Sequence, residues 1–477
     1  MKITNHRNRG TALMFAVLAM LVLTLLGMEI TRMTLNQYQN VYHASAWQES
    51  LMAAESGVDL AIVELRKALV TTGSGGAFPS PWVATSGTGG WSEYDLTGLN
   101  YSGQGGTKMT MSVTVDAPAS MVNTVGWQYY RIRSIGTNAI SGVGRVGDQK
   151  QDLDLRKLSL RVDRYTGSTL TSPQVSRKLE VIVRPMSPFR AALVAKSQIS
   201  MTDHNIVIDS YDSTDSTKST NGQWDVAKRQ QHGDIATDGT LIAAGDAQVY
   251  GTASTNNGTV TGFSNITGEI RTDFWEDLPS VNAPTWSSFI VSPSSGGNGT
   301  TLGSSTTKGA TRYKLTDITL AGNGVLTITG TSTATTYVDI WVTGGISLKG
   351  NGKIQLDPNV IATFWVAGDI DLGGNGMQNG NGSTDDRPSH NLIYGIKPSS
   401  GSQSISLHGN GNMEASVYAP DASVSLSGGG SSGAFSGSIV GNTISMNGVY
   451  QVHYDESLLN SGPPSDYKIA SWFEDTR

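Results

Sequence analysis

The sequence predicts an α+β protein with a long N-terminal transmembrane helix, a small antiparallel β-unit and a C-terminal, mainly-β domain of the β-solenoid or β-helix type. Three observations predict this class. An uncharged run near the start continues into apolar residues at helical spacing. Strand-like alternation follows between residues 101 and 190. The pattern Leu-x-Gly-Asn-Gly then occurs four times in the last third of the chain.

A chain of 477 residues is long enough for two or three domains. Shifts in composition and periodicity place the expected boundaries. We expect a basic leader (1–10), a transmembrane and amphipathic helix (11–70), a loop or linker (71–100), a small β-domain (101–190), a Gly/Asn-rich solenoid (191–460) and a tail (461–477).

Composition excludes several classes of function. The net charge is −6, charged residues make up only 15% of the chain, and no basic stripe is present, so nucleic acid is not an expected partner. There are no cysteines, which excludes disulfides, iron–sulfur clusters and cysteine-ligated zinc. The 57 glycines, with many Ser, Thr and Asn residues, favour short strands joined by turns.

The first structural element is an apolar run of 18 residues from Thr11 to Met28, which includes Leu18 and Leu25. As a helix it spans roughly 27 Å, enough to cross a bilayer. Basic residues precede the run without an acid, so the short N-terminus is expected in the cytoplasm and the bulk of the chain outside the inner membrane. This predicts a single-pass protein.

Two simpler interpretations of this run compete with a retained, functional helix. A secretory signal needs a small-residue cleavage site soon after the apolar run, and the nearest one, Ala44-Ser45-Ala46, lies far beyond it. A plain membrane anchor remains open, but an anchor does not require the apolar pattern that follows.

That pattern is a seam of apolar residues spaced three and four apart, as in helices that pack along one face. No proline occurs between Thr11 and Val70, so one continuous helix of roughly 90 Å is expected. Its first third is apolar all round and can exchange lipid for neighbouring helices. The seam consists of Ala44, Trp47, Leu51, Ala54, Val58, Ala61 and Leu65.

The segment "RGTALMFAVLAMLVLTLLG", followed by "AAESGVDLAIVEL", resembles the N-terminal module of PilX-type minor pilins. These belong to the type IV pilus and type II secretion pseudopilin superfamily. The resemblance covers about the first 70 residues. It implies that a prepilin peptidase cuts between Gly10 and Thr11, and that other pilin or pseudopilin subunits are partners.

One position departs from the family pattern. Most major pilins carry glutamate as the fifth mature residue, and Phe15 stands there in this chain. A buried glutamate is costly unless it neutralises the N-terminal amine of a neighbouring chain. A subunit with no subunit above it does not need one, so Phe15 favours a minor subunit that sits at a filament tip or primes assembly.

The middle of the chain alternates apolar and polar residues, as half-buried strands do. The stretches at 108–115, 129–138, 158–164 and 178–185 have this pattern. They predict an antiparallel unit packed on the C-terminal half of the helix, as the resemblance to a pilin head also implies.

The four repeats begin at Leu320, Leu348, Leu372 and Leu407, and each lies between short strands. Asn and Gly accept positive φ and form tight corners. Hairpins would use the same residues, but short strands that recur without long alternation favour the stacked coils of a solenoid. The expected corners are Gly322, Asn323, Gly324, Gly350, Asn351, Gly352, Gly374, Asn375, Gly376, Gly409, Asn410 and Gly411.

The pattern continues through 415–455, where "VYAP" and "HYDESL" resemble segments of domains attached to PilX-type N-termini. The remainder of the chain is expected to be a cap or a loose end. The aromatic residues Trp341, Trp365, Tyr394 and Tyr418 are candidates for sugar or partner contacts, and equally for the core.

No catalytic or metal site is predicted. Solenoids can host polysaccharide-active enzymes, which need paired carboxylates on one face, and Asp369 with Asp371 is the nearest candidate. The stretch Gly429–Gly433 fits Gly-x-Ser-x-Gly but lacks a strand–turn–helix setting. The seven histidines are scattered without metal spacing. The oxygen-rich loop that starts at Asp209 is a weaker candidate for calcium.

The sequence therefore predicts a structural subunit without cofactor, metal or enzymatic activity. It takes part in assembling a type IV pilus-like or secretion-like filament and displays a β-domain for adhesion or cargo contact. The alternatives that remain are a membrane-anchored adhesin without a filament and a tethered polysaccharide-active enzyme.

Overall fold

The computed structural model describes most of the chain. The described residues are 7–72, 82–86, 92–102, 108–118, 120–121, 127–139, 174–203, 205–331, 333–373, 375–379, 387–408, 412–428, 434–462 and 464–475. They fall into two compact units. Unit 1 comprises residues 1–68, 75–184 and 467–477, and unit 2 comprises residues 69–74 and 185–466.

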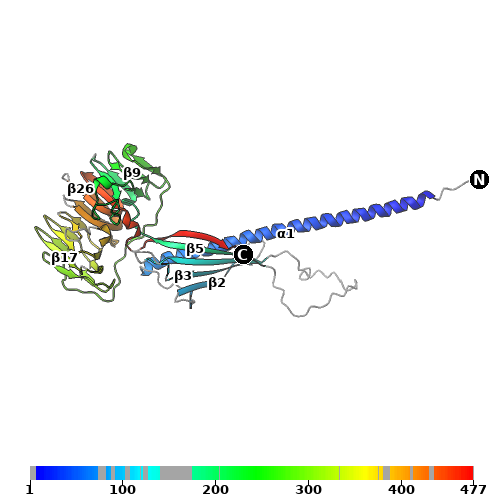
Figure 1. The fold of residues 1–477 in the computed structure, drawn as a ribbon, viewed down its shortest axis with the longest axis horizontal. Helices are drawn as coiled ribbons and strands as arrows, with labels where there is room; N and C mark the ends of the chain where they lie inside the picture. The colour runs from blue at the N-terminus through cyan, green and yellow to red at the C-terminus, as the bar shows by residue number, and fades with distance from the viewer. Residues whose placement is uncertain are drawn as a thin grey trace, which may run out of the picture. The chain divides into compact units, whose positions relative to one another are not determined.

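Unit 1 begins with one unbroken helix, α1, from Arg7 to Thr72. This confirms the predicted continuous helix. Gly27 and Gly57 lie within it, and each lowers helix propensity by about 1 kcal/mol without ending the helix. Figure 1 shows the C-terminal half of α1 alongside strands β3 and β5, while its N-terminal half extends beyond the sheet.

The remainder of unit 1 is a six-stranded sheet with the order β1-β2-β3-β4-β5-β29. Neighbouring strands from β1 to β5 pair in antiparallel fashion, as predicted for the small β-unit. The strands are β1 (Val83–Ser86), β2 (Ser92–Ser102), β3 (Lys108–Asp116), β4 (Tyr130–Ala139), β5 (Gln174–Met186) and β29 (Asp466–Asp475).

Two of the expected boundaries differ from this sheet. The segment 71–100, expected as a loop, contains β1 and most of β2. The tail 461–477, expected as a cap or loose end, contains β29, which completes the sheet beside β5. The strands β1 and β2 are rich in polar residues, so their hydrophobic pattern is weak and only pairing with a neighbour reveals them. The expected strand at 158–164 lies outside the described residues.

Unit 2 is a parallel β-helix, which confirms the predicted solenoid. Every pairing between its named strands is parallel, and three strands of each full coil stack on the equivalent strands of the next coil. The regular coils have three faces. The first face contains β15 (Arg312–Leu315), β18 (Thr336–Val342), β21 (Val360–Val366) and β24 (Asn391–Gly395). The second face contains β16 (Ile318–Leu320), β19 (Ile346–Leu348), β22 (Ile370–Leu372) and β25 (Gln403–His408). The third face contains β14 (Thr301–Gly303), β17 (Val325–Thr329), β20 (Lys353–Leu356) and β23 (Met377–Gln378).

The remaining coils join at the end of this stack. Long strands bend from one face to the next in two coils, and shorter strands complete the others. They are β26 (Asn412–Gly428), β27 (Ala434–Gly448), β28 (Gln451–Asp455), β6 (Leu193–Met201), β7 (Val207–Tyr211), β8 (Ile235–Thr237), β9 (Leu241–Ala243), β10 (Gln248–Val249), β11 (Ala253–Ser254), β12 (Thr259–Thr261) and β13 (Ile270–Arg271). Short 3-10 turns occur at Val226–Lys228, Phe263–Asn265, Pro388–His390 and Glu456–Asn460.

The coils are not stacked in chain order. The first strand of unit 2, β6, pairs with β27, and β7 pairs with β28, so the chain joins the stack in its middle. It winds outward to β13 and then continues at the opposite end with β14 and β15. It returns coil by coil to β28. After β28 and the 3-10 turn that follows it, Ser465 N donates to Met186 O at 2.9 Å. The two ends of unit 2 are therefore adjacent.

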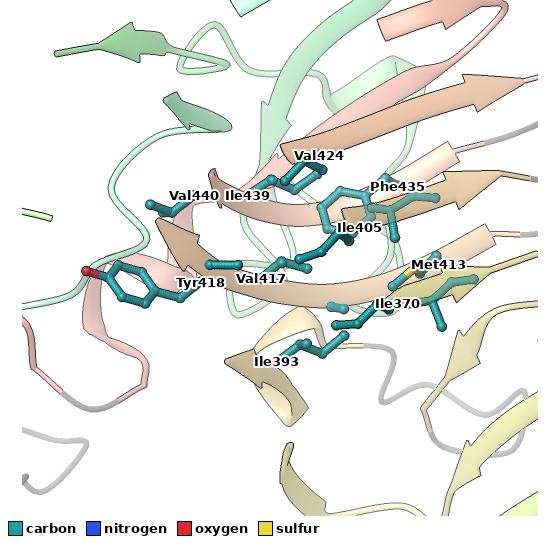
Figure 2. Close-up of a cluster of buried hydrophobic side chains, with 14 of the residues drawn as sticks. Ile370, Ile393, Ile405, Met413, Val417, Tyr418, Val424, Phe435, Ile439 and Val440 are labelled. Carbon is teal, nitrogen blue, oxygen red and sulfur yellow. The ribbon is translucent and has the colours of Figure 1, made fainter. Parts of the chain in front are cut away.

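The core of the β-helix is formed by every second residue of each strand, as the pleat requires. In β18, Val338 and Ile340 are almost fully buried and stand in register with Ala362 and Phe364 of β21. Figure 2 shows the same stacking for Ile393 and Val417 in later coils. Coil-on-coil stacking of inward aliphatic side chains thus makes one continuous core.

Candidate functional site

The N-terminal half of α1 exposes a continuous apolar surface. Phe15 is 71% exposed, and Leu18, Leu25 and Met28 are more than half exposed. Gly10 and Thr11 lie near the start of the helix. The helix contains a stretch that is long and apolar enough to cross a membrane, none of it buried inside the protein. An exposed apolar surface of this length requires lipid or other helices around it.

The C-terminal half of α1 buries one face against the sheet of its own unit. Four seam residues, Ala54, Val58, Ala61 and Leu65, are fully buried. Leu51 is partly buried, and Trp47 remains 48% exposed with the guanidinium of Arg177 lying 3.5 Å from its ring centroid. The C-terminal part of the seam therefore packs within the subunit. The N-terminal end of the seam, at Trp47, and the apolar N-terminal half of α1 remain accessible.

Close packing of α1 on the sheet depends on two glycines outside the predicted seam, Gly57 of α1 and Gly136 of β4. A Cβ atom added to Gly136 of β4 would lie 2.0 Å from Ser50 O, and one added to Gly57 would lie 2.2 Å from Ser134 Oγ. Glu49 accepts a hydrogen bond from Asn138 Nδ2 at 2.7 Å. The Ala53-Ala54 and Gly57 positions were the sequence signal for this close approach.

The corners of the β-helix bring successive Gly-Asn-Gly copies over one another. Gly322, Gly350 and Gly376 have positive φ, between +60° and +69°. Asn351 Nδ2 donates to Asn323 Oδ1 at 3.0 Å, one coil apart. Gly324, Gly352 and Asn375 complete these corners, whereas Gly374, Gly409, Asn410 and Gly411 lie outside the described residues.

Several carboxylates of the repeat region form hydrogen bonds or ion pairs between neighbouring coils. Asp369 Oδ1 accepts from Ser404 N, and Asp317 Oδ1 accepts from Gly345 N, so both tie neighbouring coils together. Asp371 pairs with His408 at 2.5 Å on an exposed part of the second face. The candidate Asp369 and Asp371 pair is thus occupied by contacts between coils.

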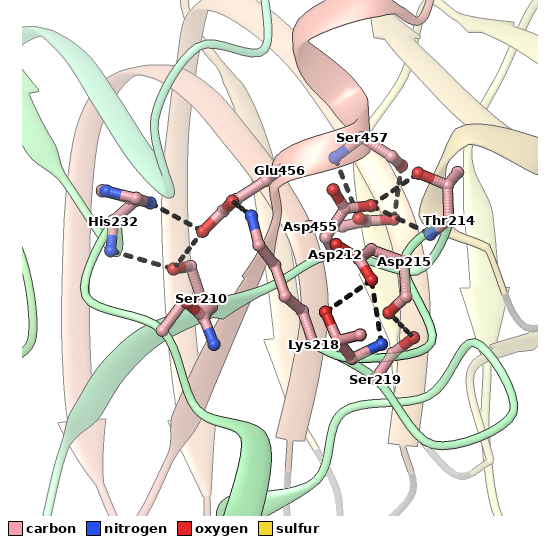
Figure 3. A network of polar contacts seen from close by, with 12 residues as sticks. Ser210, Asp212, Thr214, Asp215, Lys218, Ser219, His232, Asp455, Glu456 and Ser457 are labelled. Atoms are coloured by element: carbon pink, nitrogen blue, oxygen red, sulfur yellow. Dashed lines mark hydrogen bonds and ion pairs between the residues drawn. The ribbon is translucent and has the colours of Figure 1, made fainter.

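Polar side chains hold the loop of residues 212–232 against β28, and Figure 3 shows the part of this network around Asp455 and Glu456. Asp209 contacts His453 Nδ1 at 2.6 Å and Arg229 Nε at 2.8 Å. Trp224 stacks on His453 with ring centroids 3.8 Å apart. Each charged group of this network has a protein partner, so Asp209 is already bound to basic side chains and is not arranged for calcium. In the described part of the chain, no three His, Asp or Glu side chains gather as a metal site.

Two acids of the same network differ in pKa. Burial raises the pKa of Asp455, although hydrogen bonds from Ser213 and Ser457 oppose this effect. Burial also acts to raise the pKa of Glu456, but hydrogen bonds from His232, Lys218 and Ser210 outweigh it and lower the pKa. His232 Nδ1 lies 2.7 Å from Glu456, and Lys218 Nζ lies 3.1 Å from it. Figure 3 shows both bases converging on Glu456.

An outward row of side chains runs along the first face of the β-helix through successive coils. We call it the outer ladder, and its register follows from eight parallel pairings. In order along the stack it contains Trp341, Trp365, Tyr394, Tyr418, Val440, Val194, Ala236, Ser254 and Arg271.

The segment 272–289, which connects the two ends of the stack, covers the aromatic half of the outer ladder. Trp286 contacts Trp341 and Trp365 edge-on, at 6.3 and 5.4 Å between ring centroids. Tyr418 Oη donates to Pro279 O at 3.0 Å. Figure 2 shows the Tyr418 ring pointing away from the side chains inside the coils. Tyr394 and Tyr418 are nevertheless buried members of the hydrophobic core, and Trp341 and Trp365 are partly buried against it beneath this connecting segment.

Beyond the aromatic half, the outer ladder borders a hollow of about 400 Å³. Burial raises the pKa of Asp234, one of its lining residues, and that of Glu276, which forms an ion pair with Arg190. None of the candidate site residues predicted from the sequence lines this hollow. The sequence signal was the stretch "EIRTDFWED" (269–277), where charged and aromatic residues gather directly after a Gly- and Asn-rich segment.

Comparison with known proteins gives limited matches. Residues 286–461 match the model of a family described as "Domain of unknown function (DUF7305)", which covers part of the β-helix. No curated protein matches the chain. Among solved structures, the competence-associated pilin ComZ from Thermus thermophilus is similar with a TM-score of 0.27 and 12% identity, over 90% of this chain and 97% of that chain.

Proposed function

We propose that this protein is a minor pilin or pseudopilin-like subunit that is held in the inner membrane by α1 and enters a filament through it. The observation that carries the proposal is the division of α1 into two parts. One part packs on the sheet through Ala54, Val58, Ala61 and Leu65, and the other exposes apolar residues on all sides. Such a helix can leave lipid and pack against other subunits without unfolding the sheet.

The charges at the start of α1 support the orientation. Lys2, Arg7 and Arg9 precede the apolar run and favour the cytoplasmic side. The sheet of unit 1 and the β-helix of unit 2 then lie outside the inner membrane. We propose that prepilin peptidase removes residues 1–10 and that Thr11 becomes the mature N-terminus.

A position at the filament tip is the finer part of the proposal. Phe15 is 71% exposed and carries no charge, so it offers no partner for the N-terminal amine of another subunit. A large β-helix inserted between β5 and β29 would also be difficult to repeat along a packed fibre. A tip position accommodates both features.

A structural role is favoured over an enzymatic one. The candidate carboxylates Asp369 and Asp371 already bind neighbouring groups, Ser404 N and His408. We therefore propose that the β-helix is displayed for binding, as an adhesin or cargo-contact domain, rather than for catalysis.

The decisive experiment co-expresses the full chain with a prepilin peptidase in a bacterial inner membrane and determines the N-terminal mass. We expect a start at Thr11, and an uncleaved chain when Gly10→Val is introduced. Gly27→Val is the matched control and leaves cleavage unchanged. A chain that keeps Met1 in the presence of active peptidase supports a plain anchor, and a start near Trp47 supports a secreted protein. Either result contradicts the proposal.

The filament and tip are tested separately in sheared filament fractions from a host that assembles them. Immunogold label on the β-helix is expected at filament ends only. Label spaced regularly along the fibre would refute the tip position, and absence from the filament fraction would refute the filament role.

A further inference from the structure

The hollow on the first face of the β-helix has a simple structural origin. The outer ladder changes from large to small side chains, from Tyr418 on one side to Ala236 and Ser254 on the other. The aromatic part fills the space beneath the connecting segment, as Tyr418 does by donating to Pro279 O. Where the ladder becomes small, this space stays open and forms the hollow of about 400 Å³. A volume of this size is typical of small-molecule sites.

The wall of the hollow contains both hydrogen-bond donors and hydrogen-bond acceptors. Arg190 pairs with the buried Glu276, and Arg271 donates to both oxygens of Asp273 at 3.0 and 2.7 Å. Asp234 accepts from the backbone of Thr252 at 2.7 Å. Thr252 and Ser254, both of which carry a hydroxyl, also line the hollow. Hydroxyl groups of a ligand, which both donate and accept, suit such a wall better than a group of one charge.

The rim adds a flat apolar surface. Trp275 lines the hollow yet is 71% exposed, an unusual position for the largest apolar side chain. Its ring can pack against the apolar face of a sugar ring while the polar wall binds the hydroxyls. Phe274, partly buried beside it, supports this end of the connecting segment.

The charge of the wall limits the class of ligand. Four lining carboxylates, Asp234, Glu269, Asp273 and Glu276, and two lining arginines, Arg190 and Arg271, give −4 + 2 = −2. A uronic-acid polymer or a nucleic acid would be repelled.

From this combination we infer that the hollow binds an uncharged pyranose oligosaccharide, with one ring stacked on Trp275 and its hydroxyls bound by the Arg190–Glu276 and Arg271–Asp273 pairs. This inference concerns the β-helix alone and does not depend on filament assembly. It gives the displayed domain a ligand class and a binding site.

The test uses the full chain in a detergent that has no sugar headgroup. Affinities are measured by calorimetry for neutral tetrasaccharides of glucose, galactose, mannose, N-acetylglucosamine and N-acetylgalactosamine. Tetragalacturonate and tetralysine serve as the anionic and cationic probes. We expect at least one neutral tetrasaccharide to bind, and to bind more tightly than either charged probe.

Two variants locate the site. Trp275→Ala removes an exposed ring, so the fold is retained and affinity falls about tenfold. Ser254→Trp fills the hollow and abolishes binding, with circular dichroism as the check of folding. Trp472→Ala, which truncates a 45% exposed tryptophan in unit 1, is the matched control and leaves affinity unchanged.

Three results would overturn the inference. The first is that no neutral tetrasaccharide binds. The second is that a charged probe binds most tightly. The third is that Trp275→Ala and Ser254→Trp both bind as tightly as the unaltered protein. None of these outcomes bears on cleavage at Gly10, so failure here is distinguishable from failure of the pilin proposal.

Discussion

At the scale of single residues, the absence of a side chain at Gly136 allows α1 to lie against the sheet. A Cβ atom there would come within 2.0 Å of Ser50 O and 2.6 Å of Ala54 N, both backbone atoms of the helix. Backbone cannot rotate away as the end of a side chain can, so the helix as a whole would have to move. The docking of α1 on the sheet therefore depends on the absence of a side chain at Gly136 in β4.

We expect Gly136→Ala to destabilise the docking of α1 on the sheet by about 1–3 kcal/mol through overpacking. The change is measured by hydrogen exchange of peptides from β3 and β4 in the full chain. Gly27→Ala is the matched control, because no atom lies within 4 Å of the added group and alanine favours a helix. Equal protection in the two variants would contradict this role for Gly136.

A second residue-scale prediction concerns Glu456. Its pKa is lowered in the folded protein, so its ionisation stabilises the fold above the ordinary glutamate pKa of 4.5, and this contribution is lost as pH falls through the lower, folded value. We expect Glu456→Gln to cost about 1–3 kcal/mol at pH 7, because it leaves Lys218 and His232 without a carboxylate.

Urea unfolding followed by circular dichroism, repeated from pH 7 to pH 3, checks this prediction. The difference between the unaltered protein and Glu456→Gln should shrink below pH 4.5. Asp371→Asn is the control, since that carboxylate is 41% exposed in its pair with His408 and its loss should cost at most about 0.5 kcal/mol. A difference independent of pH would show that ionisation of Glu456 does not contribute.

At the scale of elements, the coils of the β-helix depend on corners that no side chain obstructs. Gly322 and Gly350 occupy equivalent corners one coil apart, both with positive φ. Their surroundings differ. A Cβ atom added to Gly322 would have no atom within 4 Å, whereas a Cβ atom added to Gly350 would lie 3.2–3.3 Å from the backbone of Gly322. The corner at Gly350 is therefore restricted to glycine by the coil stacked against it as well as by its positive φ.

We therefore expect Gly322→Ala to cost about 1 kcal/mol, from left-handed strain alone. Gly350→Ala should cost about 2 kcal/mol, because crowding of the stacked corner is added to that strain. The urea midpoints of the two variants give the order directly. A larger effect at Gly322 would mean that the corners do not stack as described.

At the scale of the whole molecule, the β-helix is an insertion within unit 1. The chain leaves the sheet after β5 and returns as β29, its neighbour in the sheet. Within unit 2 the two ends meet, where Ser465 N donates to Met186 O and Ser187 Oγ donates to Ser461 O. A domain whose ends are adjacent can be removed without separating parts of the sheet that must pair.

We expect the fragment 186–465 to fold alone into a soluble, β-rich domain with a cooperative unfolding transition. Its circular dichroism should show β-structure without the helical signal of α1, and its sugar affinity should match that of the full chain. The fragment 191–460, which lacks both end contacts, is the matched comparison and should be less stable. Aggregation or gradual unfolding of 186–465 would show that the β-helix needs unit 1 to fold.

The sequence by itself determined the elements whose signals are local. A proline-free run with helical spacing predicted α1, and repeated Gly-Asn-Gly corners with short strands predicted the β-helix, because both depend on residues a few positions apart. Only the tertiary structure decided which strands are neighbours. The docking of β6 on β27, the pairing of β29 beside β5, and the hollow between Arg190 and Trp275 join residues up to hundreds of positions apart. Such contacts depend on which surfaces fit together, and no periodicity along the chain encodes that fit.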